Sequence, residues 1–181
     1  MTDTDTRLYI ALTSRDLDRM RDLQESLSGY PVGMKVGLEL FVRRGPSLLE
    51  EIIEAGFPLF LDLKFHDIPF TVAGAVRSAC RFGPSLINVH AWGGMEMMRA
   101  AAEASAGSTK VLAVTLLTSL DESDLSMMGV EDSPLSTVER LAGMAAEAGL
   151  DGVVCSPFEA EAVRNAAGED FLVVTPGIRP S

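Results

Sequence analysis

The sequence predicts an α/β fold, a (β/α)8 TIM barrel whose eighth strand–helix unit is missing from this chain. Short apolar runs alternate with amphipathic helical stretches, which is typical of parallel sheets with right-handed crossovers. No G-x-G-x-x-G motif follows the first apolar run, which disfavours a dinucleotide-binding sheet. Polar residues instead follow the apolar runs, where barrel enzymes carry their active sites.

Seven apolar runs are the predicted strands: 8–12, 33–37, 59–63, 86–90, 111–116, 152–155 and 171–175. Residues at helical spacing lie between them, as in Leu17, Met20, Leu23 and Leu27. Barrel closure requires one more strand than the sequence offers, and residues 177–181 read as a loop. We therefore expect residues 1–181 to form a single, incomplete barrel domain, from a truncated chain or a gene fragment.

Composition excludes several classes of protein. The chain has 181 residues, of which 47% are hydrophobic, enough for one domain with a real core. Its net charge is -11 and no basic cluster stands out, so no nucleic-acid partner is expected. No apolar run approaches the roughly 18 residues of a membrane span, and the polar start lacks a signal peptide. A cytoplasmic protein with buried free thiols at Cys80 and Cys155 is expected.

Residues 62–67 carry charged side chains where a buried strand is expected to end, a pattern that favours a functional site. Asp62, Lys64 and Asp67 directly follow the apolar run 57–61, which reads as a buried strand. Strand alternation would place Asp62 and Lys64 on the same face of the sheet. Charges are costly in such a place unless they are paired, so function explains the triplet better than stability does.

Residues 62–69, Asp-Leu-Lys-Phe-His-Asp-Ile-Pro, resemble the D-x-K-x-x-D-I-P signature of the orotidine 5′-phosphate decarboxylase family. That family carries out the last step of de novo pyrimidine nucleotide synthesis. Weaker similarities follow in the family's order, at residues 34–37, 87–91, 114–119, 151–156 and 175–180. The resemblance covers nearly the whole chain, and six segments in sequence argue against coincidence.

The resemblance implies decarboxylation of orotidine 5′-phosphate to UMP without a cofactor or a metal. Lys64 would stabilise the carbanion at carbon 6 and donate the proton. Asp62 would lie beside the substrate carboxylate, and Lys35 would link the carboxylates into an alternating row of charges. Neighbouring carboxylates favour an ammonium ion, which suits a proton donor. Lys64, Asp62, Asp67 and Lys35 are thus the expected catalytic residues.

The resemblance also implies a homodimer, in which Asp67, Ile68 and Thr71 reach the partner's site. The pyrimidine would contact the segment after the fifth strand, and the loop after the seventh would close over the substrate. The expected substrate-binding residues are Thr13, Lys35, Asp62, Lys64, Asp67, Ile68, Thr71, Thr118, Ser119 and Arg179.

Two departures from the family pattern bear on activity. The family's first strand ends Ala-Leu-Asp, whose Asp helps hold the ribose hydroxyls, whereas this chain reads Ala11-Leu12-Thr13. Asp16 lies three residues further on, where helix N-capping is the favoured role. The family's eighth strand carries a Gly-Arg pair that binds the substrate phosphate, and residues 1–181 contain no run that predicts such a strand.

Two alternatives stay open. Related sugar-phosphate decarboxylases and synthases carry a similar motif but use a divalent metal, and the His66-to-Pro69 continuation argues against them. An inactive fragment or a pseudoenzyme that acts only as a binding module is the other, motivated by Thr13 and the missing strand. His66 and His90 are interpreted as hydrogen-bonded structural histidines and not as metal ligands.

Overall fold

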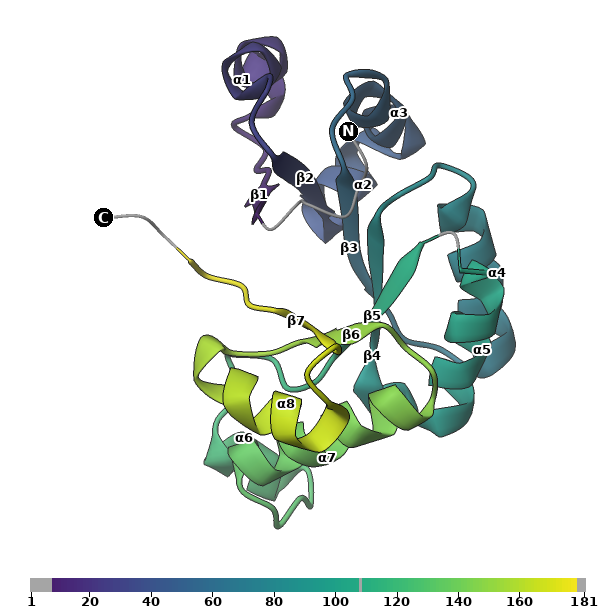
Figure 1. The fold of residues 1–181 in the computed structure, drawn as a ribbon, viewed down its shortest axis with the longest axis vertical. Helices are drawn as coiled ribbons and strands as arrows, with labels where there is room; N and C mark the ends of the chain where they lie inside the picture. Colours follow the sequence, from purple (N-terminus) through teal and green to yellow (C-terminus); the bar gives the residue numbers. More distant parts are fainter. Residues whose placement is uncertain (1–7, 108, 179–181) are drawn as a thin grey trace.

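The computed structural model describes residues 8–107 and 109–178, which form a parallel sheet that curls into part of a barrel, with helices outside it (Figure 1). The strands lie in the order β1-β2-β3-β4-β5-β6-β7, each parallel to the next. This order confirms the predicted barrel-type α/β fold. The strands are β1 (Leu8–Ala11), β2 (Val32–Gly37), β3 (Leu59–Phe65), β4 (Leu86–His90), β5 (Lys110–Val114), β6 (Gly152–Val154) and β7 (Leu172–Val174).

Every run predicted to be a strand is one, and no predicted bound is more than two residues from the observed one, a difference reached at the ends of β3 and β5. For β3 the prediction stopped at residue 63, because charged residues follow, but the strand continues to Phe65. Asp62 and Lys64 are ion-paired to each other, so their charges are compensated within the strand. A charged residue therefore did not mark the end of this element.

Helices connect the strands and cover the outer, convex face of the sheet (Figure 1). In α7, the Ser133 side chain accepts a hydrogen bond from the amide of Ser136, and Pro134 begins the helix, as helix N-termini favour. Leu141 and Ala145 lie on the buried face of this helix. The α-helices are α1 (Met20–Leu27), α2 (Leu38–Arg44), α3 (Pro46–Glu54), α4 (Pro69–Cys80), α5 (Met95–Ser105), α6 (Glu122–Met127), α7 (Pro134–Glu147) and α8 (Ala160–Ala167). Short 3-10 helices are η2 (Leu17–Arg19), η3 (Ala91–Gly93) and η4 (Pro157–Glu159).

The main hydrophobic core lies between the sheet and the helices. Alternate strand residues such as Val36, Leu61 and Ile87 point into it and are almost completely buried. Met97 and Met98 of α5 fill the same core. Burial of these side chains removes apolar surface from water, which is the dominant stabilising term in a fold of this size.

The concave face of the sheet has a second, smaller apolar cluster. Phe60, Leu86 and Leu112 form it, and Tyr9 packs edge-on against Phe60 with ring centroids 5.9 Å apart. Because side chains alternate along a strand, Asp62 lies on the same face as Phe60, one step nearer the carboxyl end of the strand. The concave face is therefore apolar at the level of Phe60 and charged above it.

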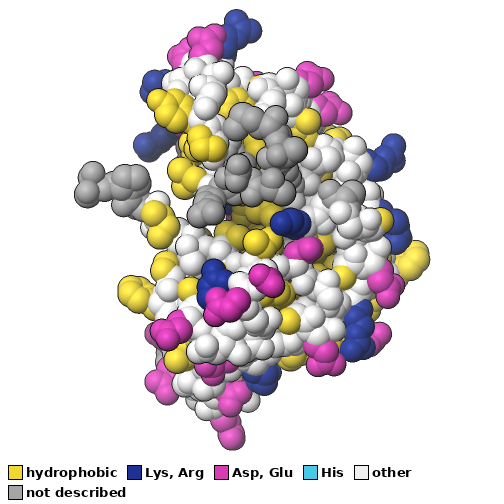
Figure 2. Space-filling model, in the orientation of Figure 1, with side chains coloured by type: hydrophobic (Ala, Val, Ile, Leu, Met, Phe, Trp, Pro, Cys, Tyr) yellow, Lys and Arg dark blue, Asp and Glu magenta, His cyan; other side chains and the backbone are white. Residues whose placement is uncertain are grey.

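Charged side chains of both signs cover the surface. On the face drawn in Figure 2, acidic and basic side chains are interspersed around the edge, without a continuous basic patch among the described residues. No helix in the described part of the chain is both long and apolar enough to cross a membrane. Both cysteines are free thiols; Cys155 is buried as predicted, whereas Cys80 is only partly buried.

Candidate active site

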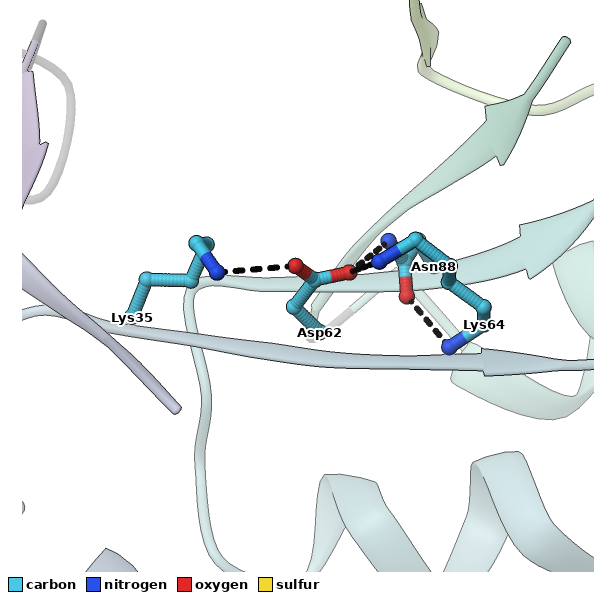
Figure 3. Close-up of polar contacts among 4 residues, drawn as sticks. All are labelled: Lys35, Asp62, Lys64 and Asn88. Carbon is cyan, nitrogen blue, oxygen red and sulfur yellow. Dashed lines mark hydrogen bonds and ion pairs between the residues drawn. The ribbon is translucent and has the colours of Figure 1, made fainter. Parts of the chain in front are cut away.

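Asp62 is held between two lysines at the carboxyl end of the sheet (Figure 3). Its Oδ2 atom lies 2.9 Å from Nζ of Lys35 on β2, and its Oδ1 atom lies 2.6 Å from Nζ of Lys64 on β3. The carboxamide of Asn88 on β4 donates a third hydrogen bond, with Nδ2 2.7 Å from Oδ1 of Asp62. Three neighbouring strands thus meet at one carboxylate.

These contacts keep Asp62 ionised in spite of its burial. Burial alone raises the pKa of Asp62, because the charged form loses its hydration. The hydrogen bond from Lys64, the charge of Lys35 and the amide of Asn88 outweigh burial, so the pKa of Asp62 lies below its ordinary value. The Asp62 side chain is only 12% exposed, whereas Lys64 keeps 31% of its side chain exposed, open to a ligand.

The backbone of Lys64 is irregular. Lys64 has φ 52°, in the left-handed region that non-glycine residues seldom adopt. The pairing of β3 with β4 shifts register here: Leu61 pairs with Ile87, and the next paired residues are Phe65 and Val89. Asp62 and Lys64 do meet, as expected, but through this bulge and not through the regular alternation that the prediction assumed.

The segment after β3 is exposed and is not ion-paired with this cluster of charges. Asp67 and Ile68 are exposed, and Oδ1 of Asp67 accepts a hydrogen bond from the amide of Ile68 at 2.6 Å. Thr71, in the first turn of α4, is exposed as well. Among residues 8–107 and 109–178, Asp67 forms no ion pair with Lys64. Within one chain, the charged cluster contains Lys35, Asp62 and Lys64 but not Asp67.

Other predicted substrate contacts lie at the same edge of the sheet. Thr13 follows β1 and is exposed, with its amide and its hydroxyl donating to the Asp16 carboxylate at 2.6 and 2.7 Å. Asp16 occupies the N-cap position of η2, but its side chain forms no cap hydrogen bond, so the capping role was wrong. Thr118 and Ser119 are exposed in the loop after β5. Arg179 lies outside the described residues.

The two histidines stack beside the cluster. The rings of His66 and His90 are 5.5 Å apart at 29°. Burial, with smaller effects from His66 and Lys64, lowers the pKa of His90. Its Nδ1 atom is buried and has no hydrogen-bond partner in the described part of the chain, so the expected hydrogen-bonded role does not hold for that atom. A neutral ring at this position adds no positive charge near Lys64.

Sequence reasoning missed Asn88. Its side chain is completely buried and contacts both Asp62 and the backbone amide of Lys64. A polar residue in the middle of the apolar strand 86–90 was the available signal, because a buried amide needs hydrogen-bond partners. Across the described residues, no three His, Cys, Asp or Glu side chains are grouped to hold a metal ion.

Comparisons with known proteins identify the family of this chain. Residues 6–181 match the model of the "Orotidine 5'-phosphate decarboxylase / HUMPS family". The chain is 51% identical to an orotidine 5′-phosphate decarboxylase of Nitrosospira multiformis and 52% identical to one of Chromohalobacter salexigens, covering 98% of this chain and 74% and 77% of those proteins.

Two solved structures have the same fold as this chain. The crystal structure of an orotidine 5′-phosphate decarboxylase from Lactobacillus acidophilus superposes with a TM-score of 0.88 at 36% identity, covering 97% of this chain and 83% of that one. A decarboxylase from Methanocaldococcus jannaschii shares the fold, with a TM-score of 0.78 at 23% identity, covering 96% of this chain and 78% of that one. The family match and the identity to the two bacterial relatives show that this chain belongs to the orotidine 5′-phosphate decarboxylase / HUMPS family.

Proposed function

We propose that this protein removes CO₂ from orotidine 5′-phosphate to form UMP, with Lys64 as the proton donor. The observation that carries the proposal is the Lys35–Asp62–Lys64 row at the carboxyl edge of a barrel-type sheet. Its relatives in Nitrosospira multiformis and Chromohalobacter salexigens are named for the same activity. No observation on the described residues favours the metal-dependent alternatives.

The reaction needs electrostatic stabilisation. The bond between carbon 6 and the carboxylate breaks, CO₂ leaves, and the electron pair stays on carbon 6. The Lys64 ammonium stabilises this carbanion and transfers a proton to it, after which solvent restores the proton on Nζ. Because Asp62 already holds Lys64 at 2.6 Å, little reorganisation is needed when the charge develops.

Asp62 and Lys35 would set the charge balance of the site. A substrate carboxylate placed beside Asp62 brings two negative charges close to two ammonium groups. Departure of CO₂ removes the substrate carboxylate charge while the carbanion forms nearer to Lys64. Lys35 binds the Oδ2 side of Asp62, which leaves Lys64 on the Oδ1 side free to face the ring.

We further propose that two copies of the chain complete each site. Asp67 is exposed and lies outside its own chain's ion-pair cluster. Next to it, Ile68 is 65% and Phe70 82% exposed, and both side chains are apolar. Burying them against a second copy would remove apolar surface from water and bring Asp67 and Thr71 to the partner's site.

The first experiment replaces single lysines. Lys64→Ala should abolish turnover of orotidine 5′-phosphate, measured by the loss of its ultraviolet absorbance. Lys110→Ala is the matched control, because Lys110 is exposed at the amino end of β5, at the opposite edge of the sheet. Near-normal turnover in Lys64→Ala would refute the role of Lys64. Loss of turnover on chelation of divalent metals would instead favour the metal-dependent alternative.

The second experiment tests the shared site. Lys64→Ala and Asp67→Ala chains are each expected to be inactive alone. In a mixed dimer, one site combines the intact Lys64 of one chain with the intact Asp67 of the other. Random mixing should therefore restore roughly a quarter of the unaltered activity in a two-fold dimer. No recovery on mixing, with dimers present by ultracentrifugation, would contradict the shared site.

An unaltered chain that shows no turnover needs a further measurement. Titration with UMP, followed by calorimetry, separates the remaining hypotheses. Binding without turnover would favour the binding-module alternative, and no binding would favour the inactive-fragment alternative.

A further inference from the structure

We infer that Asn88 is a positioning residue for the reaction: its carboxamide fixes both the Asp62 carboxylate and the backbone of Lys64, and thereby aims the Lys64 ammonium. This inference rests on the proposed roles of Asp62 and Lys64. Asn88 reaches the cluster from β4 and is completely buried, and Figure 3 shows its contacts with Asp62 and Lys64. It is therefore placed to act through its neighbours and not on the substrate.

The two hydrogen bonds of Asn88 have opposite polarity. Its Nδ2 atom donates to Oδ1 of Asp62 at 2.7 Å, and its Oδ1 atom accepts from the backbone amide of Lys64 at 2.8 Å. An ionised carboxylate can only accept and a backbone N–H can only donate, so the two neighbours fix the orientation of the carboxamide. A carboxamide meets both demands, whereas an ionised aspartate or an aliphatic side chain does not.

The second hydrogen bond replaces a missing backbone contact. Leu61 pairs with Ile87 and Phe65 pairs with Val89, so three residues of β3 stand opposite Asn88 alone. The amide of Lys64 consequently bonds to the Asn88 side chain. The left-handed backbone of Lys64, with φ 52°, is of a kind that costs about 1–3 kcal/mol and persists only when its surroundings hold it.

Lys64 and Asn88 both donate hydrogen bonds to the same oxygen atom of Asp62. Oδ1 of Asp62 accepts from both Nζ of Lys64 and Nδ2 of Asn88, while Asn88 also holds the Lys64 backbone. Lys64 is thus fixed at both ends, at its main chain directly and at its ammonium through Asp62. Releasing Asn88 would let the bulge relax and the ammonium move, and a displacement of about 1 Å can cost a hundredfold in rate.

The test compares Asn88→Ala with a control that also removes one buried hydrogen bond. Thr109→Val is that control, because the Thr109 hydroxyl donates to the Pro84 carbonyl in the buried region at the other edge of the sheet. Both variants should unfold at a lower temperature. Asn88→Ala alone should lower kcat by about ten- to a hundredfold, with KM little changed. Equal kcat in both variants would overturn the inference.

The Asn88→Asp variant adds a second measurement, the pH dependence of its relative activity, which should not change if Asn88 is only structural. When ionised, the introduced carboxyl group would repel Asp62; when protonated, it can donate to Asp62 and accept from Lys64, as the carboxamide does. The activity of this variant relative to the unaltered protein should therefore rise as the pH falls. The ionisable neighbours Asp62, Lys35, Lys64 and His90 are present in both proteins, so the ratio isolates the effect of the new carboxyl group. A ratio independent of pH would count against the inference.

A measurement without turnover separates this inference from the proposed function. In Asn88→Ala the pKa of Asp62, followed by carbon-13 NMR of its carboxyl group, should rise, because one hydrogen bond to the ionised form is lost. An unaltered chain without decarboxylase activity would defeat the proposed function alone. An unchanged Asp62 pKa in Asn88→Ala would defeat the positioning role alone.

Discussion

Lys35 on β2 binds Asp62 on β3 across the strand pair, with Nζ 2.9 Å from Oδ2, although the residue paired with Asp62 in the sheet is Gly37. Gly37 has no side chain, and a Cβ atom there would lie 3.9 Å from the Lys35 ammonium. The side chain of Lys35 therefore extends along its own strand, past Gly37, to reach Asp62. This arrangement ties two strands together through a charge-assisted hydrogen bond.

Loss of this contact should impair the reaction. Lys35→Met keeps much of the length of the side chain but removes the charge and the hydrogen bond to Asp62. A charged hydrogen bond of about 1.5–3 kcal/mol corresponds to a fall in kcat/KM of about ten- to a hundredfold. Steady-state kinetics with orotidine 5′-phosphate checks this, and the Lys110→Ala variant should retain normal values. An unchanged kcat/KM would show that Lys35 is only a surface lysine.

Asp62 should make stability depend on acid pH. Its folded pKa is lowered from 3.8, so the unfolded chain binds the proton more tightly than the folded one. The contribution of Asp62 to stability is then fully present above the unfolded pKa and is lost as pH falls through the lower folded pKa. Urea unfolding at several pH values should show the stability difference between the protein and Asp62→Asn shrinking in acid. A difference that grows in acid would contradict the lowered pKa.

Cys155 should be unreactive in the folded protein. Burial, with a smaller effect of Glu159, raises the pKa of the Cys155 thiol to about 12, and the residue is 1% exposed. The thiolate is the reactive form, so iodoacetamide at a pH of about 8 should modify Cys80 first and Cys155 only after unfolding. Peptide mass spectrometry reads both sites in one sample. Rapid alkylation of Cys155 in the folded chain would contradict this packing.

Gly152 should be required for the contact between β6 and β7. A Cβ atom on Gly152 would collide with the backbone oxygen of Leu172, so Gly152→Ala should push the last strand away and lower stability. Gly143→Ala, in the middle of α7 with nothing within 4 Å of the new atom, should raise stability by about 0.5–1 kcal/mol. Thermal unfolding compares the pair, and equal effects would be inconsistent with the close approach at Gly152.

Thr13 tests the departure from the family pattern. Thr13→Asp supplies the carboxylate that the resemblance implies for ribose binding, but Asp16 already lies beside position 13. Like charges at this distance oppose each other, so Thr13→Asp combined with Asp16→Asn should bind UMP more tightly than Thr13→Asp alone. Calorimetric titration measures both. Equal affinities of the single and double variants for UMP would argue against the repulsion.

Strand positions were predictable because local pattern decides them. Apolar runs bounded by polar or glycine residues located all seven strands, and β4 was placed at its observed bounds, Leu86–His90. The end of β3 was not predictable, since the ion pair of Asp62 with Lys64 and the hydrogen bonds of both residues to Asn88 form only in the folded sheet. The role of Asp16 was mistaken for a different reason: local spacing suggested a helix cap, whereas its carboxylate accepts hydrogen bonds from Thr13, three residues earlier.

By itself the sequence determined the α/β class and the order of the elements, and it singled out Asp62 and Lys64 as charges at the end of a buried strand. These predictions follow from hydrophobic periodicity and from the cost of burying charge, which are properties of short segments, whereas Lys35 was expected from the family resemblance. Only the tertiary structure decided that Asn88 joins them and that the Lys64 backbone takes up a left-handed bulge. Both depend on the register of β3 against β4, because hydrogen bonds between residues distant in sequence form only once the strands are aligned.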